Sequence, residues 1–532
     1  MRFYRKIVPL FFLIQKQPRP CYTYLTMTRI ARASLIVAVF FALDKMLGFL
    51  RQILFARVGG LYGLDVFNTS NNIPDFLSAL ISGGALGIAL IPVLSEFLER
   101  DGRRAAWGLF SRIVNLAFIV TAVVSLVIIA LASPLVRYII APGFDPQKQA
   151  LTASLMRLDL IAILIFSISG LVMAGLQANQ HFLLPALAPA FYNLGQIFGV
   201  TILAPQTGLH LGPVTLPAFG MGLHGLVYGV ILGAILHLAI QVPGLIHYEF
   251  RWAPAIDLKN PGVRQVLTLM GPRVLTMAFL QIYFVARDNL ASRFGEGGVA
   301  ALNLGWFIQQ VPETLIGTAI AIALLPSLSE QITRHESKVF RQTINRALRA
   351  MLALTLPIAA LLAVGARPLI QAAFGFNTAG TDMILWATRA FLLGLMGHAW
   401  LEVAVRSFYA QQNARIPLIA ASLQAVAFIA LAVLLALTIG HVGIALADTF
   451  TFTGEALLLL FLLNRRFPGV LGGVGNTLLR SCLAAAAGAL IVYLLMRILP
   501  LPALPLSLGA LVIGGLAGLP LIWPEVKMLV KL

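Results

Sequence analysis

The sequence predicts an all-α, polytopic membrane protein, and three observations support this prediction. Hydrophobic residues make up 59% of the 532 residues and charged residues only 11%, whereas an ordinary soluble domain has roughly 25% charged residues. Apolar runs of about 20 residues, the length that crosses a bilayer as a helix, recur along the whole chain. These runs are continuous, whereas the strands of a membrane β-barrel alternate apolar and polar residues. A soluble enzyme with one membrane anchor is excluded, because no stretch of about 100 residues is polar enough to fold as a soluble domain.

The apolar runs indicate about fourteen transmembrane helices. The expected spans are 33–56, 66–95, 107–132, 150–177, 184–204, 219–247, 266–292, 298–328, 345–366, 383–409, 416–438, 441–463, 476–497 and 503–523. Lys and Arg gather in alternate connecting segments, such as 99–104, 248–264 and 330–346. Cytoplasmic loops carry the excess of positive charge, so we expect both termini in the cytoplasm. The net charge of +18 is explained by the same excess of Lys and Arg in cytoplasmic loops, so it does not indicate a nucleic-acid partner.

The chain begins with a basic, partly apolar extension, residues 1–26, that has no small-residue cleavage site before the first span. Met27 opens "MTRIARASLIVAVFF", a short basic lead into a membrane helix, so both Met1 and Met27 stay open as the start. Cys21 and Cys482 lie far apart and have no metal-type spacing. They therefore indicate neither a disulfide framework nor a metal site.

One nine-residue phrase occurs twice in the chain. "IALIPVLSE" occupies residues 88–96 and "IALLPSLSE" occupies 322–330, an offset of 234 positions. At the same offset Arg112 matches Arg346. The matches continue with small slips over about 110 residues, which indicates duplication of a six-helix unit rather than chance.

The duplication predicts the domain organisation. We expect an N-lobe at 27–250 and a C-lobe at 251–466, followed by two further helices at 467–532 that contact lipid tails and form a tail groove. Because six is even, both copies enter the membrane in the same direction, and a pseudo-twofold axis along the membrane normal relates them. This architecture is typical of alternating-access transporters. Pro92 and Pro326, in the repeated phrase, are expected to kink or end the second helix of each lobe.

Several ionisable residues fall inside the expected spans, where charge is costly and usually faces a cavity. Arg pairs bidentately with phosphate oxygens, so a cation-lined cavity suits an anionic headgroup. The headgroup-binding candidates are Arg51, Lys45, Arg273 and Arg287. The candidates for gate or counter-charge are Asp44, Asp65 and Asp288. Gly48, Gly271 and Pro272 are expected hinge or structural positions.

These charges also have plainer interpretations. Two neighbouring pairs can also be neutralised structural pairs: Asp44 with Lys45, and Arg287 with Asp288. Three arginines can be explained as side chains that reach to the membrane interface: Arg57, Arg293 and Arg406. His181, His247, His398 and His441 are isolated in sequence, with no metal or triad-like spacing. "GGVGNTLLR" at 472–480 lacks the Gly-Lys-Ser/Thr of a phosphate loop, so we expect no cofactor, no catalytic residue and no enzymatic activity.

Longer stretches carry a family resemblance that covers nearly everything from Met27 on. They are "LGFLRQILFARVGG", "LDVFNTSNNIPDFL", "GALGIALIPVLSEF", "QANQHFLLPALAPAFYNLG", "QQVPETLIGTAIAIALLPSLSEQI" and "RSFYAQQNARIPLIAA". In this order they resemble the MurJ/MviN family of lipid II flippases, within the multidrug/oligosaccharidyl-lipid/polysaccharide exporter superfamily. The resemblance also favours Met27 as the start.

The resemblance implies export of a polyprenyl-diphosphate-linked peptidoglycan precursor across the bacterial cytoplasmic membrane, for cell-wall synthesis. It implies that ion gradients or membrane potential, rather than nucleotide, drive the switch. The implied partners are the lipid-linked glycan, membrane lipid and peptidoglycan-synthesis proteins. In some members a sodium ion lies between helices 7, 11 and 12. Asp288 matches the helix-7 ligand, but helix 11 offers no carboxylate.

The chain departs from the family pattern at several charged positions. The family's Ser-Arg is Asp44-Lys45 here, although Arg51 and Asp65 are retained. Family charges are also replaced at Gln52, Ser78, Gly83, Phe307 and Gln310. Either the phosphate-binding charge has moved to helix 7, or this is a divergent paralogue that carries another lipid-linked glycan. A multidrug exporter, a glycan polymerase and a scaffold without transport activity are the remaining alternatives. A drug exporter should have a net acidic cavity, and a polymerase should have a large external loop.

Overall fold

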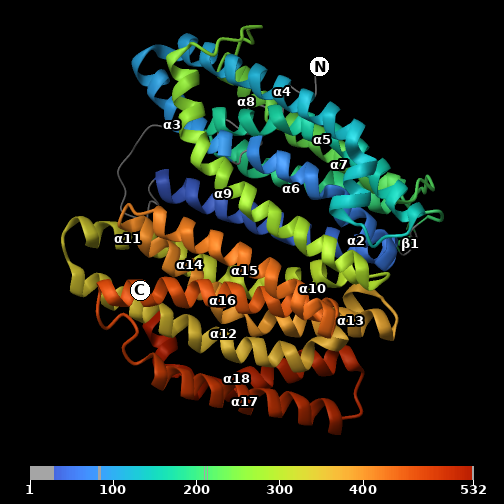
Figure 1. The fold of residues 1–532 in the computed structure, drawn as a ribbon, viewed down its shortest axis with the longest axis vertical. Helices are drawn as coiled ribbons and strands as arrows, with labels where there is room; N and C mark the ends of the chain where they lie inside the picture. Colours follow the sequence, from blue (N-terminus) through green and yellow to red (C-terminus); the bar gives the residue numbers. More distant parts are fainter. Residues whose placement is uncertain (1–28, 82–84, 209, 212–213, 530–532) are drawn as a thin grey trace, which may run out of the picture. The chain divides into compact units, whose positions relative to one another are not determined.

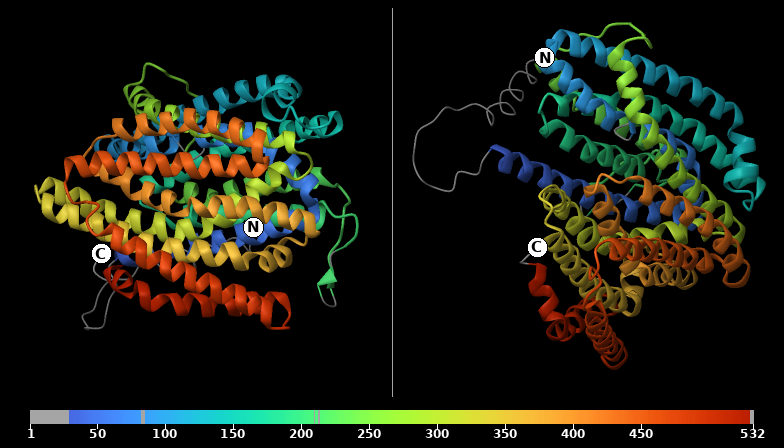
Figure 2. Two further views of the ribbon diagram at one scale, coloured as in Figure 1. Left: turned by 60° about the horizontal axis from the view of Figure 1, so that its bottom comes forward. Right: turned by 60° about the vertical axis from the view of Figure 1, so that its left-hand side comes forward.

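The computed structural model describes residues 29–81, 85–208, 210–211 and 214–529 (Figures 1 and 2). Almost all of this part of the chain is helical, as predicted. The exception is a small antiparallel hairpin of β1 (His210–Leu211) and β2 (Val214–Thr215), in which His210 pairs with Thr215. The expected extension 1–26, Met27 and Gly83 lie outside the described residues.

The helices follow one another with short connections. They are α2 (Arg29–Ile81), α3 (Ala85–Arg100), α4 (Gly102–Pro134), η1 (Leu135–Ile140), α5 (Pro146–Ala178), α6 (Leu183–Phe198), η2 (Gly199–Leu203), α7 (Leu223–Ala239), α8 (Val242–His247), α9 (Pro261–Ala291), η3 (Ser292–Phe294), α10 (Gly298–Glu313), η4 (Thr314–Thr318), α11 (Ala319–Thr333), α12 (Ser337–Phe374), α13 (Thr378–Leu393), α14 (Leu395–Ala410), α15 (Arg415–Ile439), α16 (His441–Arg466), α17 (Val474–Ile498) and α18 (Ala503–Leu529).

Ten helices of the described part are long and apolar enough to cross a membrane, or eleven if the bent pair α13 and α14 is one span. Each of the fourteen expected ranges is largely helical where it is described. The count of ten or eleven covers only the described residues. α2 contains the first expected span and part of the second, with a kink at Gly60 between them. The span expected at 266–292 lies within α9.

The duplication is visible in the lengths of the helices. At the offset of 234, α4 with η1 (102–140) matches α12 (337–374) to within one residue. At an offset of 232, α5 (146–178) matches the pair α13 and α14 (378–410). Corresponding apolar runs of equal length therefore form corresponding helices. The axis that relates the two copies stays a prediction.

The repeated phrase lies inside a helix in both copies. Pro92 is within α3, which continues to Arg100, and Pro326 is within α11, which continues to Thr333. The prolines therefore do not end these helices, and the alternative, a kink at each proline, stays a prediction. Proline removes one hydrogen bond of the ladder, but the following turn keeps its own bonds and the helix continues. A hinge role for both prolines stays a prediction.

The chain divides into two compact units. Unit 1 consists of residues 1–54, 73–130 and 155–274, and unit 2 of residues 55–72, 131–154 and 275–532. The two units are interleaved in sequence, because the segments 55–72 and 131–154 pack with the C-terminal part of the chain. The predicted lobe boundary at 250–251 stays a prediction.

In unit 1, glycines allow α6 and α7 to pack at backbone contact. A Cβ added at Gly195 would lie 2.3 Å from the Gly233 Cα, and one added at Gly199 would lie 2.5 Å from the Gly229 Cα. Such small residues are what permits close helix packing within a membrane. The contact fixes the position of α6, which carries Tyr192 and Asn193 of the candidate site.

In unit 2, α17 and α18 pack together and against α12. A Cβ added at Gly488 would lie 2.8 Å from the Gly514 carbonyl oxygen. The Ser507 hydroxyl of α18 donates to the Gly365 carbonyl of α12 at 2.6 Å. The outer faces of both helices expose leucines and valines, among them Leu483, Leu490, Leu508, Val512 and Leu516. This composition suits contact with lipid tails.

We predict that Gly233→Ala destabilises the protein. The added methyl group would lie 2.5 Å from the Tyr192 carbonyl oxygen, and overpacking of this kind costs about 1–3 kcal/mol. Thermal unfolding of the purified protein in detergent measures the effect. The matched control is Gly454→Ala in α16, where a Cβ meets nothing within 4 Å. That change should leave stability unchanged or raise it, and equal loss in both variants would contradict the packing argument.

Candidate functional site

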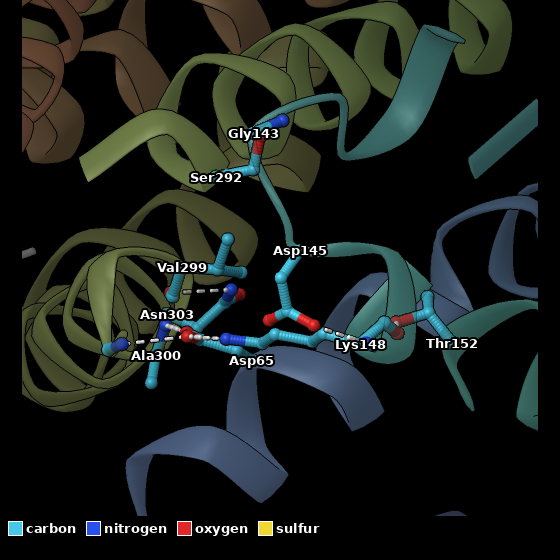
Figure 3. Close-up of polar contacts among 10 residues, drawn as sticks. Asp65, Gly143, Asp145, Lys148, Thr152, Ser292, Val299, Ala300 and Asn303 are labelled. Atoms are coloured by element: carbon cyan, nitrogen blue, oxygen red, sulfur yellow. Dashed lines mark hydrogen bonds and ion pairs between the residues drawn. The ribbon is translucent and has the colours of Figure 1, made fainter. Parts of the chain in front are cut away.

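Asp65 is the centre of a buried polar cluster in unit 2 (Figure 3). Its Oδ2 accepts a bond from the Lys148 ammonium at 2.7 Å and one from the Gly297 amide at 2.7 Å. Its Oδ1 accepts from the Ala300 amide at 2.7 Å. These amides belong to the N-cap residue and the first turn of α10, so the carboxylate caps that helix and neutralises the buried lysine. The predicted counter-charge role of Asp65 therefore has a definite partner, Lys148.

The surroundings of Lys148 explain how a lysine is kept inside the fold. Its ammonium lies 4.2 Å from the ring centre of Phe144 and 5.0 Å from that of Tyr62. Its backbone amide donates to Asp145 Oδ1 at 2.9 Å, which begins α5 (Figure 3). Lys148 lies just before the expected span 150–177 and was not a site candidate, because nothing in its sequence neighbourhood shows that Asp65, 83 positions earlier, lies beside it.

Arg287 and Asp288 of α9 form the second cluster of unit 2. Arg287 is only 2% exposed. Its Nε donates to Asp288 Oδ1 at 3.0 Å, and its Nη2 donates to Asn303 Oδ1 at 2.6 Å. Asp288 Oδ2 accepts from the Asn72 side chain at 3.0 Å. This arrangement matches the alternative of a neutralised structural pair.

A third cluster of unit 2 joins residues from three helices. Asp448 of α16 accepts the Tyr283 hydroxyl of α9 at Oδ1, and its Oδ2 lies 3.1 Å from His398 Nε2 of α14. His398 is isolated in sequence, as described above. Asp448 lies 50 positions after it, so only the packing of the helices brings the two side chains together.

In unit 1 the charged side chains meet around α2, α5 and α6. Asp44 Oδ1 accepts from the Asn193 amide at 2.8 Å. Asp44, Asp75 and Tyr192 all act electrostatically on the Arg51 guanidinium. Arg51 is partly exposed as a residue, and its Nε is buried. Asp159 of α5 is buried, and its Oδ1 has no hydrogen-bond partner in the described part of the chain.

The cluster in unit 1 is therefore mixed in charge. Arg51 was expected in a cation-lined cavity, but three carboxylates, Asp44, Asp75 and Asp159, lie with it. Lys45 is exposed and sits 5.1 Å from the Phe41 ring centre. It acts electrostatically on Asp44 without forming a contact ion pair, and the hydrogen-bonding side chain at Asp44 is Asn193. Sequence reasoning did not single out Asp75, which appeared only within the family stretch "LDVFNTSNNIPDFL".

The remaining candidates are backbone positions or have side chains outside the described part. A Cβ at Gly48 would make only ordinary contacts with Asn193 at 3.9 Å, and a Cβ at Gly271 would meet nothing within 4 Å. The side chains of Pro272 and Arg273 lie outside the described part, although α9 is helical there. Hinge roles for Gly48, Gly271 and Pro272 stay predictions. Among the described residues, no group of three or more His, Cys, Asp or Glu is suited to a metal ion.

Comparisons with known proteins decide the family. The model of the family "Lipid II flippase MurJ" matches residues 56–509, most of the chain. The chain belongs to this family. A lipid II flippase MurJ of Burkholderia cenocepacia is 29% identical over 452 residues, which cover 82% of this chain and 84% of that protein. A probable lipid II flippase MurJ of Vibrio cholerae is 26% identical over 92% of this chain and 94% of its own length.

Solved structures show the same fold. A lipid II flippase MurJ in an inward closed conformation has a TM-score of 0.75 at 20% identity, and covers 93% of this chain and 99% of that chain. An inward-facing multidrug resistance MATE transporter of the MOP superfamily has a TM-score of 0.69 at 14% identity, and covers 82% of this chain and 98% of that chain. The predicted family and the predicted all-α membrane fold are thus confirmed. A flippase is a transporter, in agreement with the prediction of a protein that is not an enzyme.

We predict that Asp65→Leu is strongly destabilising, because it leaves the Lys148 ammonium buried without its counter-charge. Breaking a buried ion pair costs about 3–5 kcal/mol. The double variant Asp65→Leu with Lys148→Met should lose less than the sum of the single losses. Thermal unfolding in detergent measures all three variants.

The control is Glu330→Gln, which breaks an exposed pair with Arg334. Exposed ion pairs contribute little to stability, so this change should have almost no effect. Additive losses in the double variant of Asp65 and Lys148 would show that the two side chains do not depend on each other.

Proposed function

We propose that this protein moves the peptidoglycan precursor lipid II, a polyprenyl-diphosphate-linked saccharide, from the inner to the outer leaflet by alternating access. Family membership supports the substrate and the reaction. The observation in the structure that carries the proposal is Arg51, an arginine inside α2 that stays partly accessible among carboxylates of its own unit. A membrane helix rarely keeps such a charge without a polar ligand.

Arg51 and Lys45 have the chemistry to bind a diphosphate. The guanidinium can donate two parallel hydrogen bonds to phosphate oxygens, and an ammonium adds a point charge. The two residues are six positions apart on α2, a rise of about 9 Å along the helix axis. A diphosphate with its first sugar can contact charges at this separation.

The neighbouring carboxylates explain how the site can also release its ligand. Asp44 and Asp75 compensate the Arg51 charge when no phosphate is bound. A phosphate must therefore replace these interactions, which weakens net binding. When no phosphate is bound, Asp44 and Asp75 keep the site close to neutral. A near-neutral site can change conformation within the membrane with a small desolvation penalty.

The arginines of α9 are proposed for a different role. Arg287 is buried against Asp288 and Asn303, so a direct contact with the headgroup requires a conformation that exposes it. We assign it to the counter-charge network of unit 2, together with Asp65 and Asp288. Arg273 stays a proposed headgroup contact on the basis of its position in α9.

The orientation and the partners are part of the same proposal. The excess of Lys and Arg in alternate connections supports cytoplasmic N and C termini in a bacterial inner membrane. The exposed apolar faces of α17 and α18 support contact with membrane lipid and with the polyprenyl tail. Proteins that make or consume the lipid-linked precursor are the proposed protein neighbours.

We predict that Arg51→Ala abolishes growth complementation of a bacterial strain depleted of its own lipid II flippase, because the variant loses its phosphate contact. Protein abundance in the membrane should stay near that of the unmodified chain. Arg51→Lys should restore part of the activity, since it keeps the charge without the bidentate geometry. Arg334→Ala, at an exposed loop arginine, is the control and should complement fully.

The substrate is tested directly in vesicles. The purified chain is reconstituted with lipid II, and the fraction of headgroups accessible from outside is followed over time. We expect faster transfer than in empty vesicles, and transfer near the empty-vesicle rate with Arg51→Ala. A parallel sample with a different lipid-linked saccharide reports specificity. Full activity of Arg51→Ala in both assays would exclude the assigned headgroup site.

A further inference from the structure

The proposed headgroup site of unit 1 holds one more carboxylate than its described basic residues compensate. Lys45 acts electrostatically on Asp44, and Arg51 acts on Asp75. Asp159 of α5 is left over. It is 2% exposed, and its Oδ1 has no hydrogen-bond partner in the described part of the chain. A buried carboxylate in this state is costly inside a membrane protein and marks a functional site.

We propose that Asp75 and Asp159 bind a primary ammonium group on the headgroup that the protein transports. The substrate is then zwitterionic, because its diphosphate contacts Arg51 and Lys45 while its amine contacts the two carboxylates. This inference rests on the proposed flippase function and adds the chemical class of the headgroup. All four side chains belong to unit 1.

Asp75 and Asp159 lie at the same depth of the membrane. Each is nine residues after the start of its expected span, 66–95 or 150–177. With cytoplasmic termini, both spans enter from the external side. Nine residues of helix rise about 14 Å, close to half of a hydrocarbon core of about 30 Å. The two carboxyl groups also act on each other, and a cation shared between them removes this repulsion.

The kink at Gly60 brings Asp75 to Arg51. The two residues are 24 positions apart on α2, a separation of about 36 Å along a straight helix. Gly60 has φ 62° and ψ −171°, a conformation essentially restricted to glycine. Because Asp75 acts electrostatically on Arg51, the chain folds back at this residue. Asp75 is exposed, so a ligand can reach it.

Tyr192 of α6 links the anionic and the cationic parts of the site. Asp159, Arg51 and Asp75 all act electrostatically on its hydroxyl. Its ring is held edge-to-face by Phe166 of α5, with 4.9 Å between ring centres and 83° between the planes. An aromatic face attracts an ammonium group. Tyr192 therefore offers a hydroxyl and an aromatic ring to a ligand that carries both charges.

Arg157 does not take the place of the missing cation. It lies two positions before Asp159 on α5, and side chains at this spacing do not face each other on a helix. Its Nε donates to the Ile129 carbonyl of α4 at 3.1 Å. The positive group beside Asp159 must therefore come from a ligand.

The residues favour an organic ammonium group over a metal ion. Among the described residues, no group of three or more His, Cys, Asp or Glu is suited to hold a metal ion. A hard metal ion needs about six oxygen ligands, whereas an ammonium group donates three hydrogen bonds. The carboxylates of Asp75 and Asp159, with one further acceptor on the ligand itself, meet this smaller requirement.

The two ends of a zwitterionic headgroup support each other's binding. When a phosphate takes the Arg51 guanidinium, Asp75 loses its counter-charge, and the amine of the same headgroup replaces it. A phosphate without an amine would leave both Asp75 and Asp159 uncompensated in the membrane. The site therefore prefers a headgroup with both charges. This preference also distinguishes the protein from an exporter of simple organic cations.

The first experiment measures binding without transport. Two soluble forms of the lipid II headgroup, both without the polyprenyl tail, are compared: one has a free amine on its peptide, and in the other that amine is acetylated. Stabilisation of the purified chain against thermal unfolding in detergent gives both Kd values. We expect the free amine to bind at least about tenfold more tightly, because acetylation removes a charge-assisted hydrogen bond. Equal binding of the two forms overturns the inference.

Variants of the two carboxylates assign the preference to this site. Asp75→Asn and Asp159→Asn should each reduce the ratio of Kd values to near one, and Asp75→Glu should retain part of it. The matched control is Asp101→Asn, which changes an exposed carboxylate of the same unit paired with Arg100 and should keep the full ratio.

These variants are also protected against misfolding. Asp159→Asn is nearly isosteric and removes an unpaired buried charge, so its Tm should not fall. Asp75 is exposed, so its replacement tests the site without disturbing packing. A full preference for the free amine in both folded variants overturns the inference.

The second experiment separates this inference from the proposed function. Vesicles carry the same two headgroups on a polyprenyl tail, and the unmodified chain should transfer the free-amine form at least about tenfold faster. Equal transfer of both forms overturns the inference and leaves the flippase function standing. Absence of transfer, with a retained difference in binding, overturns the proposed function alone. Uptake of tetraphenylphosphonium in preference to the amine-bearing lipid assigns the carboxylates to a separate cationic cargo and also overturns the inference.

Discussion

The structure depends on compensating ionic charge inside an apolar helical protein. Removing a charged side chain from water is expensive, and the cost is tolerable only where a counter-charge and hydrogen bonds replace hydration. Three of the charge pairings described above supply such a counter-charge within one unit. Asp65 neutralises Lys148 and caps α10, Asp288 neutralises Arg287, and Asp44 and Asp75 act on Arg51.

The clusters differ in accessibility, and this difference separates their proposed roles. Lys45 is exposed and Arg51 partly so, which suits a ligand that arrives and leaves. Lys148, Arg287 and Asp448 are buried, which suits charges that hold helices together. A transporter needs both accessible and buried charges. The accessible charges bind the substrate, and the buried charges hold the helices in each conformation.

Glycine and aromatic residues support these clusters from outside. The close contact of α6 and α7 through Gly195 and Gly233 places Asn193 beside Asp44. In unit 2, Phe452 and Trp306 enclose His398. Packing therefore fixes the geometry, and the charges supply the chemistry. The low dielectric constant of the membrane strengthens the electrostatic interactions between these charges.

The sequence by itself determined the class of fold, the duplication and the family. Long apolar runs, the repeated "IALIPVLSE" phrase and the ordered family stretches are local or periodic signals, so they can be read without coordinates. It also singled out Arg51, Asp65, Arg287 and Asp288, because charge inside an apolar run is visible in one dimension. Only the tertiary structure decided the partners. Lys148 for Asp65, Asn193 for Asp44, and Asp448 for His398 lie 83, 149 and 50 positions away. No periodicity links such positions, and it is the packing of helices distant in sequence that brings these side chains within hydrogen-bond reach.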